Sequence, residues 1–141
     1  MANNIAYVKD PHGLEYIAEP RETLKVKAGD CDDYAVLLAS LYRSVGLRSA
    51  VGLIDTDGDD KVEHATALVY TELPEDEIME KFNAVSQVLD IEFTAYSYFK
   101  DGNGIWIIVD PAMTYGSNEP WNVEHESYKL IYLIEPEQTG W

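Results

Sequence analysis

A turn gives way to a predicted helix in the stretch Lys27-Ala28-Gly29-Asp30-Cys31-Asp32-Asp33-Tyr34. Asp30 is placed to cap this helix, with Asp33 three residues on in a pairing that resembles a capping box. Cys31, the single cysteine of the chain, falls in the first turn. Unpaired backbone N–H groups and the positive end of the helix dipole meet there, and both favour thiolate, the form of cysteine that attacks electrophiles.

The helix is predicted over residues 32–45, because apolar side chains recur there at the i, i+3, i+4, i+7 spacing of one helical face. Gly46 fits the position that ends a helix. Ala35 and Ala39 form a small-residue side that a strand can approach closely. The pattern predicts a buried central helix with Cys31 in its first turn. Its apolar positions are Tyr34, Leu37, Leu38, Leu41 and Val45.

Strands are expected to follow. Five apolar runs have the composition of β-strands. Polar turns at residues 55–60 and 100–104 join the first two and the next two runs as antiparallel hairpins. Because helices come early and adjacent strands follow, the sequence predicts an α+β fold with an antiparallel sheet. The runs cover residues 48–54, 64–70, 91–99, 105–109 and 128–134.

A second long helix is expected to open at Pro74, which is followed by three acidic residues, and to run to about Asp90. Near the N-terminus, short helices are expected around residues 3–9 and 14–18, with a turn at residues 19–21. The apolar positions of the second long helix are Ile78, Phe82, Val85 and Leu89.

Length and composition fit one domain with a hydrophobic core. The chain has 141 residues, of which 46% are hydrophobic, so we expect residues 1–141 to form a single domain. No apolar stretch is long enough to span a membrane, and the N-terminus has no signal-peptide pattern. One cysteine excludes an internal disulfide. No compartment or oligomeric state follows, and the sequence is compatible with a domain trimmed from a longer or anchored protein.

The net charge of −16 bears on the class of partner. Nucleic acid is disfavoured, because phosphate contacts need clustered Lys and Arg. A solvated acidic surface is the simplest interpretation of the charge, and an acidic surface also suits a basic peptide or protein.

Two further residues are positioned to act with the thiol. His64 begins one apolar run, whereas His12 lies in a predicted turn and His125 stands among surface acids. Asp110 ends another apolar run, directly before a proline. A carboxylate beside His64 would hold the tautomer of the imidazole and stabilise the imidazolium. With Cys31, these residues can supply a base and an orienting group for a nucleophile.

Each of these residues also has a structural interpretation. A lone cysteine is commonly a small buried hydrophobe, a histidine at the start of a strand is commonly structural, and an aspartate before proline forms turns. Asp30, Asp32 and Asp33 surround Cys31 with negative charge, which raises a thiol pKa and opposes the helix terminus. An imidazolium from elsewhere in the chain would tip the balance toward thiolate.

Three segments resemble a known family. The stretch Gly29-Asp30-Cys31-Asp32-Asp33-Tyr34-Ala35-Val36-Leu37-Leu38, with residues 41–48 after it, resembles the nucleophile helix of the transglutaminase-like superfamily. His64-Ala65-Thr66-Ala67-Leu68-Val69 is similar to the histidine strand of that family, and Trp106-Ile107-Ile108-Val109-Asp110-Pro111 to its aspartate segment. Cysteine, histidine and aspartate follow in the family's order, and the resemblance covers roughly residues 15–112.

The resemblance implies a papain-like α+β core in which the cysteine helix packs on an antiparallel sheet. It implies Cys31 as nucleophile, His64 as base and Asp110 as orienting residue, but it does not fix the reaction. We expect acyl transfer at a peptide or protein amide, with hydrolysis over cross-linking, because the chain is a single small domain with no evident aromatic tunnel that would exclude water. The backbone N–H of Cys31 would be one oxyanion donor, and Tyr16 is the candidate for a second. Residues 72–104 form an insertion that could cover the site as a lid.

Other functions stay open beside this one. Cys31, His64 and Asp110 are all possible zinc ligands, but the paired spacings typical of zinc sites are absent. Residues 55–59 carry alternating acids, but their glycine is fourth, where a calcium loop of the EF-hand type needs it sixth. We therefore expect no metal and no cofactor. The remaining alternative is a catalytically inactive protein-interaction module with the same fold.

Overall fold

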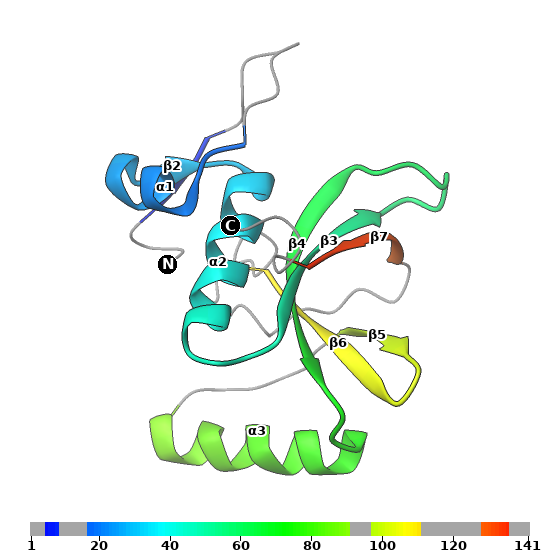
Figure 1. The fold of residues 1–141 in the computed structure, drawn as a ribbon. Coiled ribbons are helices and arrows are strands. Elements are labelled where there is room, and N and C mark those ends of the chain that lie inside the picture. The colour runs from blue at the N-terminus through cyan, green and yellow to red at the C-terminus, as the bar shows by residue number, and fades with distance from the viewer. Residues whose placement is uncertain (1–4, 9–16, 91–96, 111–127, 136–141) are drawn as a thin grey trace.

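The computed structural model describes residues 5–8, 17–90, 97–110 and 128–135. Within these residues, a five-stranded antiparallel sheet runs in the order β5-β6-β4-β3-β7, and β1 and β2 form a separate parallel pair (Figure 1). The predicted α+β class is confirmed. The elements are β1 (Ala6–Tyr7), α1 (Pro20–Val26), β2 (Ala28–Gly29), α2 (Cys31–Ser44), β3 (Ser49–Asp55), β4 (His64–Thr71), α3 (Glu75–Leu89), β5 (Tyr98–Asp101), β6 (Gly104–Val109) and β7 (Lys129–Ile134).

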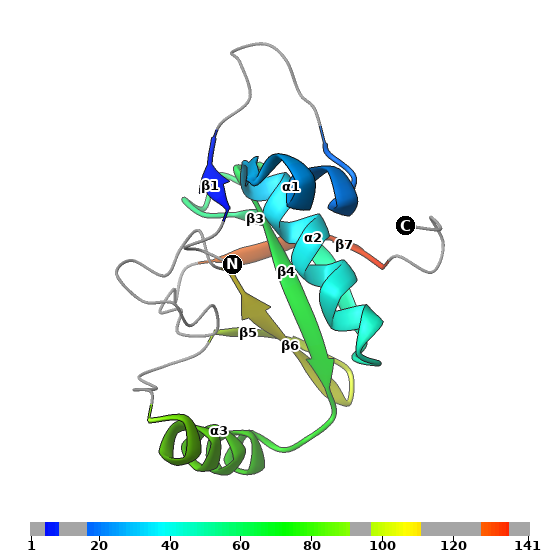
Figure 2. The ribbon, with the colours of Figure 1, turned by 90° about the vertical axis from the view of Figure 1, so that its left-hand side faces the viewer.

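Helix α2 packs across one face of the sheet, over β3 and β4 (Figure 2). The small-residue side predicted for the helix makes this contact. Ala35 and Ala39 are buried against Val51 on β3 and against Ala65 and Ala67 on β4. Small side chains on both partners let the helix approach the sheet closely, and this brings the first turn of α2 next to the start of β4.

The predicted buried face of α2 is only partly correct. Tyr34 and Leu37 are buried, and they pack with Ile5 from the N-terminal segment rather than on the sheet. Leu41 and Val45 are 43% and 72% exposed, so the prediction that they are buried was wrong. The physical reason is that the alanine side faces the sheet, which leaves these two side chains on a side of the helix that no described element covers.

The N-terminal predictions were also wrong. Residues 6 and 7 form a strand instead of part of a helix, because β1 pairs with β2: Ala6 donates to the carbonyl of Lys27 and Val8 to that of Gly29. Residues 17–18 are not helical, and residues 14–16 lie outside the described residues. The turn expected at residues 19–21 is instead the start of α1, where a proline suits the first helical position.

The predicted hairpins and the last predicted strand are present in the structure. β3 and β4 form the expected hairpin, with Leu53 opposite Ala65 and Ile54 opposite His64. β5 and β6 form the second hairpin, and β7 adds to β3 at the other side of the sheet. The strand predicted from residue 91 is described only from residue 98 on. No helix in the described part of the chain is long and apolar enough to cross a bilayer.

Helix α3 forms where it was expected, with Ile78 and Phe82 packed on β5 and β6. Val85 and Leu89 are 44% and 60% exposed, so the buried face is shorter than predicted. The helix follows the C-terminal end of β4, whereas His64 begins that strand (Figure 1). A lid made from residues 72–104 stays a prediction, and α3 itself packs at the far end of the sheet.

One close approach ties the turn before α2 to the helix. A Cβ atom added to Gly29 would lie 2.7 Å from the Cβ of Asp33 and 2.9 Å from its Oδ2. Both distances are far inside van der Waals contact, and the obstacle is a buried side chain that is held by hydrogen bonds. Position 29 therefore needs a residue without a side chain.

We expect Gly29→Ala to lower the free energy of unfolding by about 1–3 kcal/mol, because the added methyl group overpacks a site that cannot expand. Val88→Ala serves as the control, since Val88 is 82% exposed on α3 and surface changes usually stay within about 0.5 kcal/mol. Urea denaturation measures both. Equal stability of the two variants would mean that Asp33 moves aside freely.

Candidate active site

The backbone of Cys31 is held by the cap that precedes it. The carboxylate of Asp30 accepts hydrogen bonds from the N–H groups of Asp32 and Asp33 at 3.2 and 3.5 Å, and the carboxylate of Asp33 accepts one from the N–H of Asp30 at 3.1 Å. This reciprocal capping box is the one expected from the sequence. Cys31 is the first residue of α2, and its side chain is half-buried.

Asp33 does more than cap the helix. Its Oδ1 accepts a hydrogen bond of 2.7 Å from the N–H of Ala18, fifteen residues earlier. Asp33 is only 5% exposed, and backbone donors satisfy both of its oxygens. The carboxylate therefore fixes the segment before α1 against the first turn of α2, beside the thiol.

His64 and Asp110 meet across neighbouring strands. Ala67 on β4 lies opposite Val109 on β6, so continuing the register puts Asp110 opposite Thr66 and diagonal to His64 on the same face. Their side chains are 13% and 3% exposed, and Nε2 of His64 lies 2.5 Å from Oδ2 of Asp110. A carboxylate that engages one ring nitrogen selects the orientation of the imidazole.

Cys31 completes the group. Burial by itself would lower the pKa of His64, but hydrogen bonds to Asp110 and Cys31 and the negative charge on both outweigh it and raise the pKa to about 10. The thiol side chain also packs on the cluster that contains Ala65, the neighbour of His64. The structure thus brings together the three residues that the sequence selected from distant segments.

Asp32 stands on the other side of the thiol. Its Oδ1 lies 3.7 Å from Sγ of Cys31 and can accept the S–H proton. A carboxylate repels a second negative charge that forms close to it. His64 is therefore the group that must offset this repulsion when thiolate forms.

Tyr16, His12 and His125 lie outside the described residues. The sequence did not single out Tyr128, which precedes β7. Burial raises the pKa of Tyr128, and the charge of the nearby Asp110 raises it further. In the sequence, the one signal for Tyr128 is its place at the start of the last apolar run. Its position in the core depends on the pairing of β7 with β3, which the sequence does not show.

Two groups of acidic or sulfur side chains in the described residues could share a metal ion: Asp30, Cys31 and Asp32, and Asp55, Asp57, Asp59 and Glu63. In the turn after β3, however, the fully buried Asp55 already accepts hydrogen bonds from the N–H groups of Asp57, Gly58 and Asp60. Its carboxylate shapes the turn, as expected for a polar hairpin. At the thiol, zinc binding by His64 would have to break its contact with Asp110 or with Cys31.

Comparison with known proteins gives one match. The family model described as the transglutaminase-like superfamily matches residues 1–111, which include all three residues of the candidate site. No match was found among curated proteins or among solved structures.

We expect the imidazole of His64 to stay protonated through neutral pH and to titrate near pH 10. Asp110→Asn removes the carboxylate that offsets burial, so the pKa of His64 should fall by more than about one unit. Imidazole ¹⁵N chemical shifts measure both proteins. A wild-type titration close to the ordinary value of 6.5 would contradict the charged arrangement.

The same shift makes stability depend on pH. Because the pKa of His64 is higher in the fold than in the unfolded chain, its protonation stabilises the protein fully below about pH 6.5, and this contribution is lost as the pH rises through about 10. The free energy of unfolding should therefore decline between these values in the wild type and decline less in His64→Gln.

Proposed function

This chain belongs to the transglutaminase-like superfamily, and we propose that it is a thiol-dependent acyl-transfer enzyme that acts on a peptide or protein amide. The observation that carries the proposal is the arrangement around His64: Asp110 lies at 2.5 Å from Nε2, and Cys31, the first residue of α2, is close enough to raise the pKa of His64. Nucleophile, base and orienting group in this relation are the parts of a catalytic triad.

In the first half of the reaction, the Cys31 thiolate attacks the amide carbonyl, and a C–S bond forms. Because Asp110 engages Nε2, the other ring nitrogen of His64 is the one that faces the thiol and carries the mobile proton. The backbone N–H of Cys31 stabilises the oxyanion at the positive end of α2. When the tetrahedral intermediate collapses, His64 gives its proton to the leaving amine, the C–N bond breaks and a thioester remains.

In the second half, neutral His64 removes a proton from the acceptor, which attacks the thioester carbonyl. The C–S bond breaks, and the proton on His64 restores the resting pair with Cys31. Water is the acceptor that we propose, and the enzyme is then a hydrolase. Asp110 stabilises the imidazolium of the resting pair and the imidazolium that forms again in the second half.

We expect Cys31 to react with iodoacetamide at pH 7 at least about tenfold faster in the wild type than in His64→Ala, because an imidazolium favours thiolate against the charge of Asp32. Amide hydrolysis should fall about 10²–10⁴-fold in His64→Ala and vanish in Cys31→Ala. Mass spectrometry after timed alkylation measures the first, and release of a fluorescent amine from peptide amides measures the second.

Asp76→Asn is a suitable control, since it removes one acidic charge in the first turn of α3, at the far end of the sheet. It should react like the wild type. Equal, slow alkylation of wild type and His64→Ala would contradict an activated pair. Fast alkylation without a thioester from any acyl donor would instead favour the inactive interaction module.

The choice of acceptor is tested separately. With a peptide substrate and an added primary amine such as methylamine, we expect hydrolysed product to predominate at millimolar amine. Water is abundant, and none of the described residues that line the pocket beside the first turn of α2 is aromatic. Mass spectrometry distinguishes the acid from the N-methyl amide. Preferential formation of the amide would make the protein a transamidase and leave the roles of Cys31 and His64 intact.

A further inference from the structure

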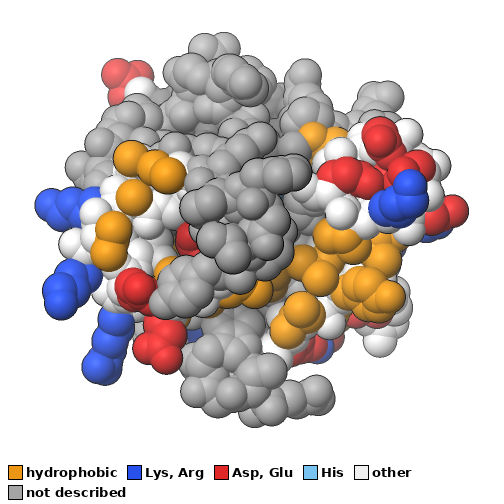
Figure 3. All heavy atoms as spheres, turned by 90° about the horizontal axis from the view of Figure 1, so that it is seen from above, with side chains coloured by type: hydrophobic (Ala, Val, Ile, Leu, Met, Phe, Trp, Pro, Cys, Tyr) orange, Lys and Arg blue, Asp and Glu red, His pale blue; other side chains and the backbone are white. Residues whose placement is uncertain are grey.

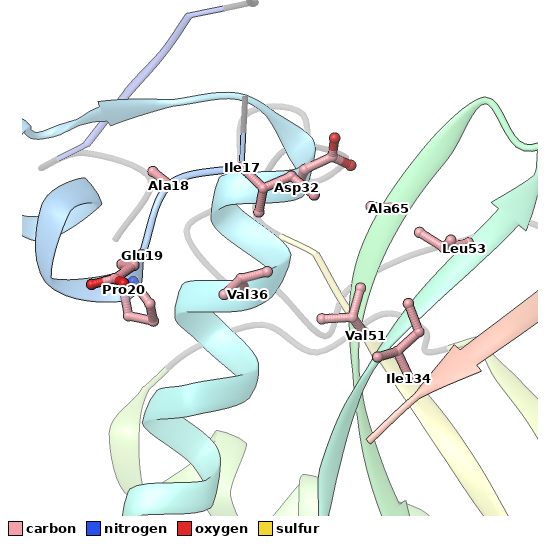
Figure 4. A pocket seen from close by; sticks show the side chains of 10 residues that line it. All are labelled: Ile17, Ala18, Glu19, Pro20, Asp32, Val36, Val51, Leu53, Ala65 and Ile134. Carbon is pink, nitrogen blue, oxygen red and sulfur yellow. The ribbon is translucent and has the colours of Figure 1, made fainter. Parts of the chain in front are cut away.

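We propose that the apolar pocket beside the first turn of α2 binds a large aliphatic or aromatic side chain on the acyl side of the substrate. The inference rests on the proposed function, because it treats Cys31 as the acceptor of that acyl group. The pocket has a volume of about 350 Å³, which is near the small end of ligand pockets, about 300–1,000 Å³. It is lined by Ile17, Ala18, Glu19, Pro20, Asp32, Val36, Val51, Leu53, Ala65 and Ile134 (Figure 4).

The lining of the pocket comes from five parts of the chain: the segment at residues 17–20, α2, β3, β4 and β7. Val36 on α2 faces Val51 on β3 across the hollow, and Ile134 closes the side formed by β7 (Figure 4). The segment before α1 forms the remaining wall, and the hydrogen bond between Ala18 and Asp33 holds it in place. The pocket is thus built from elements that are fixed on the core, and it does not depend on a single surface side chain.

The pocket adjoins the side-chain cluster on which the nucleophile packs. Cys31 packs on the same side-chain cluster as Val36, Val51, Leu53 and Ala65, all of which line the pocket. The chain neighbours of the two reacting residues also line it: Asp32 follows Cys31, and Ala65 follows His64. A substrate whose carbonyl meets Sγ therefore has this hollow close by for a neighbouring apolar side chain.

The small size of Ala65 creates the space. Ala65 lies directly opposite Leu53 in the β3–β4 pair, and a larger residue there would fill the floor next to His64. Leu53 is half-buried and Ile134 is 39% exposed, so water reaches apolar surface that an entering side chain would cover. Removing that surface from water is the driving force for binding.

The chemistry of the lining selects an apolar occupant. Glu19 and Asp32 are the two charged residues at the pocket, and the carboxylate of Asp32 points away from Val36 and Val51 (Figure 4). Seen from above, hydrophobic side chains also gather on the side of the molecule that carries β3 and β7, beside the acidic turn after β3 (Figure 3). An acidic side chain would meet repulsion from these carboxylates, and a lysine would have to take its ammonium group out of water against apolar walls.

The test measures how fast Cys31 is alkylated by four reagents of equal reactivity and different side chains. They are N-(3-methylbutyl)-, N-(2-phenylethyl)-, N-(2-aminoethyl)- and N-(2-carboxyethyl)iodoacetamide. The rate of Cys31 alkylation by each reagent is divided by the rate of the same reagent with glutathione. The gain is this ratio relative to the ratio for iodoacetamide. We expect the two apolar reagents to gain at least about tenfold and the two charged ones to gain less than about threefold.

Ile134→Lys places an ammonium group at the mouth of the pocket and should reduce the apolar gain, taken relative to that variant's own iodoacetamide rate, to less than about threefold. Leu53→Lys should do the same from the floor, and circular dichroism confirms that each variant is folded. Val88→Lys is the matched control, because Val88 is an exposed valine on α3, and it should keep the full gain.

The outcomes separate the two proposals. Fast alkylation by iodoacetamide with no apolar gain would overturn the pocket and leave the activated thiol intact. A gain for the aminoethyl reagent would also overturn the pocket, since it would show a basic occupant. Alkylation at the rate of a free thiol, with the apolar gain still present, would overturn the proposed function and show that the pocket binds apolar groups without catalysis.

Discussion

The buried carboxylate of Asp33 is the interaction on which the rest of the candidate site depends. It accepts hydrogen bonds from Asp30 and Ala18, and its Cβ occupies the space that a side chain at position 29 would need. One residue thereby joins the turn before α2, the first turn of the helix and the segment before α1. Without these bonds, a buried charge would lose its partners and Cys31 its fixed backbone.

The electrostatics of the site are a balance between opposing charges. Asp32 beside Sγ disfavours thiolate, and burial disfavours a charged imidazole. Asp110 reverses the second effect, and the charged His64 then offsets the first. The same acidic character continues over a chain of net charge −16, whereas the pocket next to the thiol is apolar. In the function that we propose, the charged side chains around Cys31 carry out the reaction, and the apolar pocket beside them selects the substrate.

Particular elements show why some sequence predictions held. The capping box at Asp30 and Asp33, the end of α2 at Gly46 and both hairpins depend on residues close in sequence, so local rules predicted them. Leu41 and Val45 were predicted to be buried and are exposed. The spacing of apolar residues shows which side of a helix is apolar, but it does not show whether another element covers that side. Residues 6 and 7 form a strand only because β2, more than twenty residues away, supplies backbone partners.

The amino-acid sequence by itself determined the fold class, the helix that carries Cys31 and the identity of the three candidate site residues. These follow from local spacing, capping and the resemblance of three segments to a family. The tertiary structure alone decided that His64 and Asp110 lie on the same face at 2.5 Å, that Tyr128 approaches Asp110, and that Val36, Leu53 and Ile134 enclose a pocket. The physical reason is that strand register and helix packing join residues far apart in the chain, and these contacts leave no local pattern.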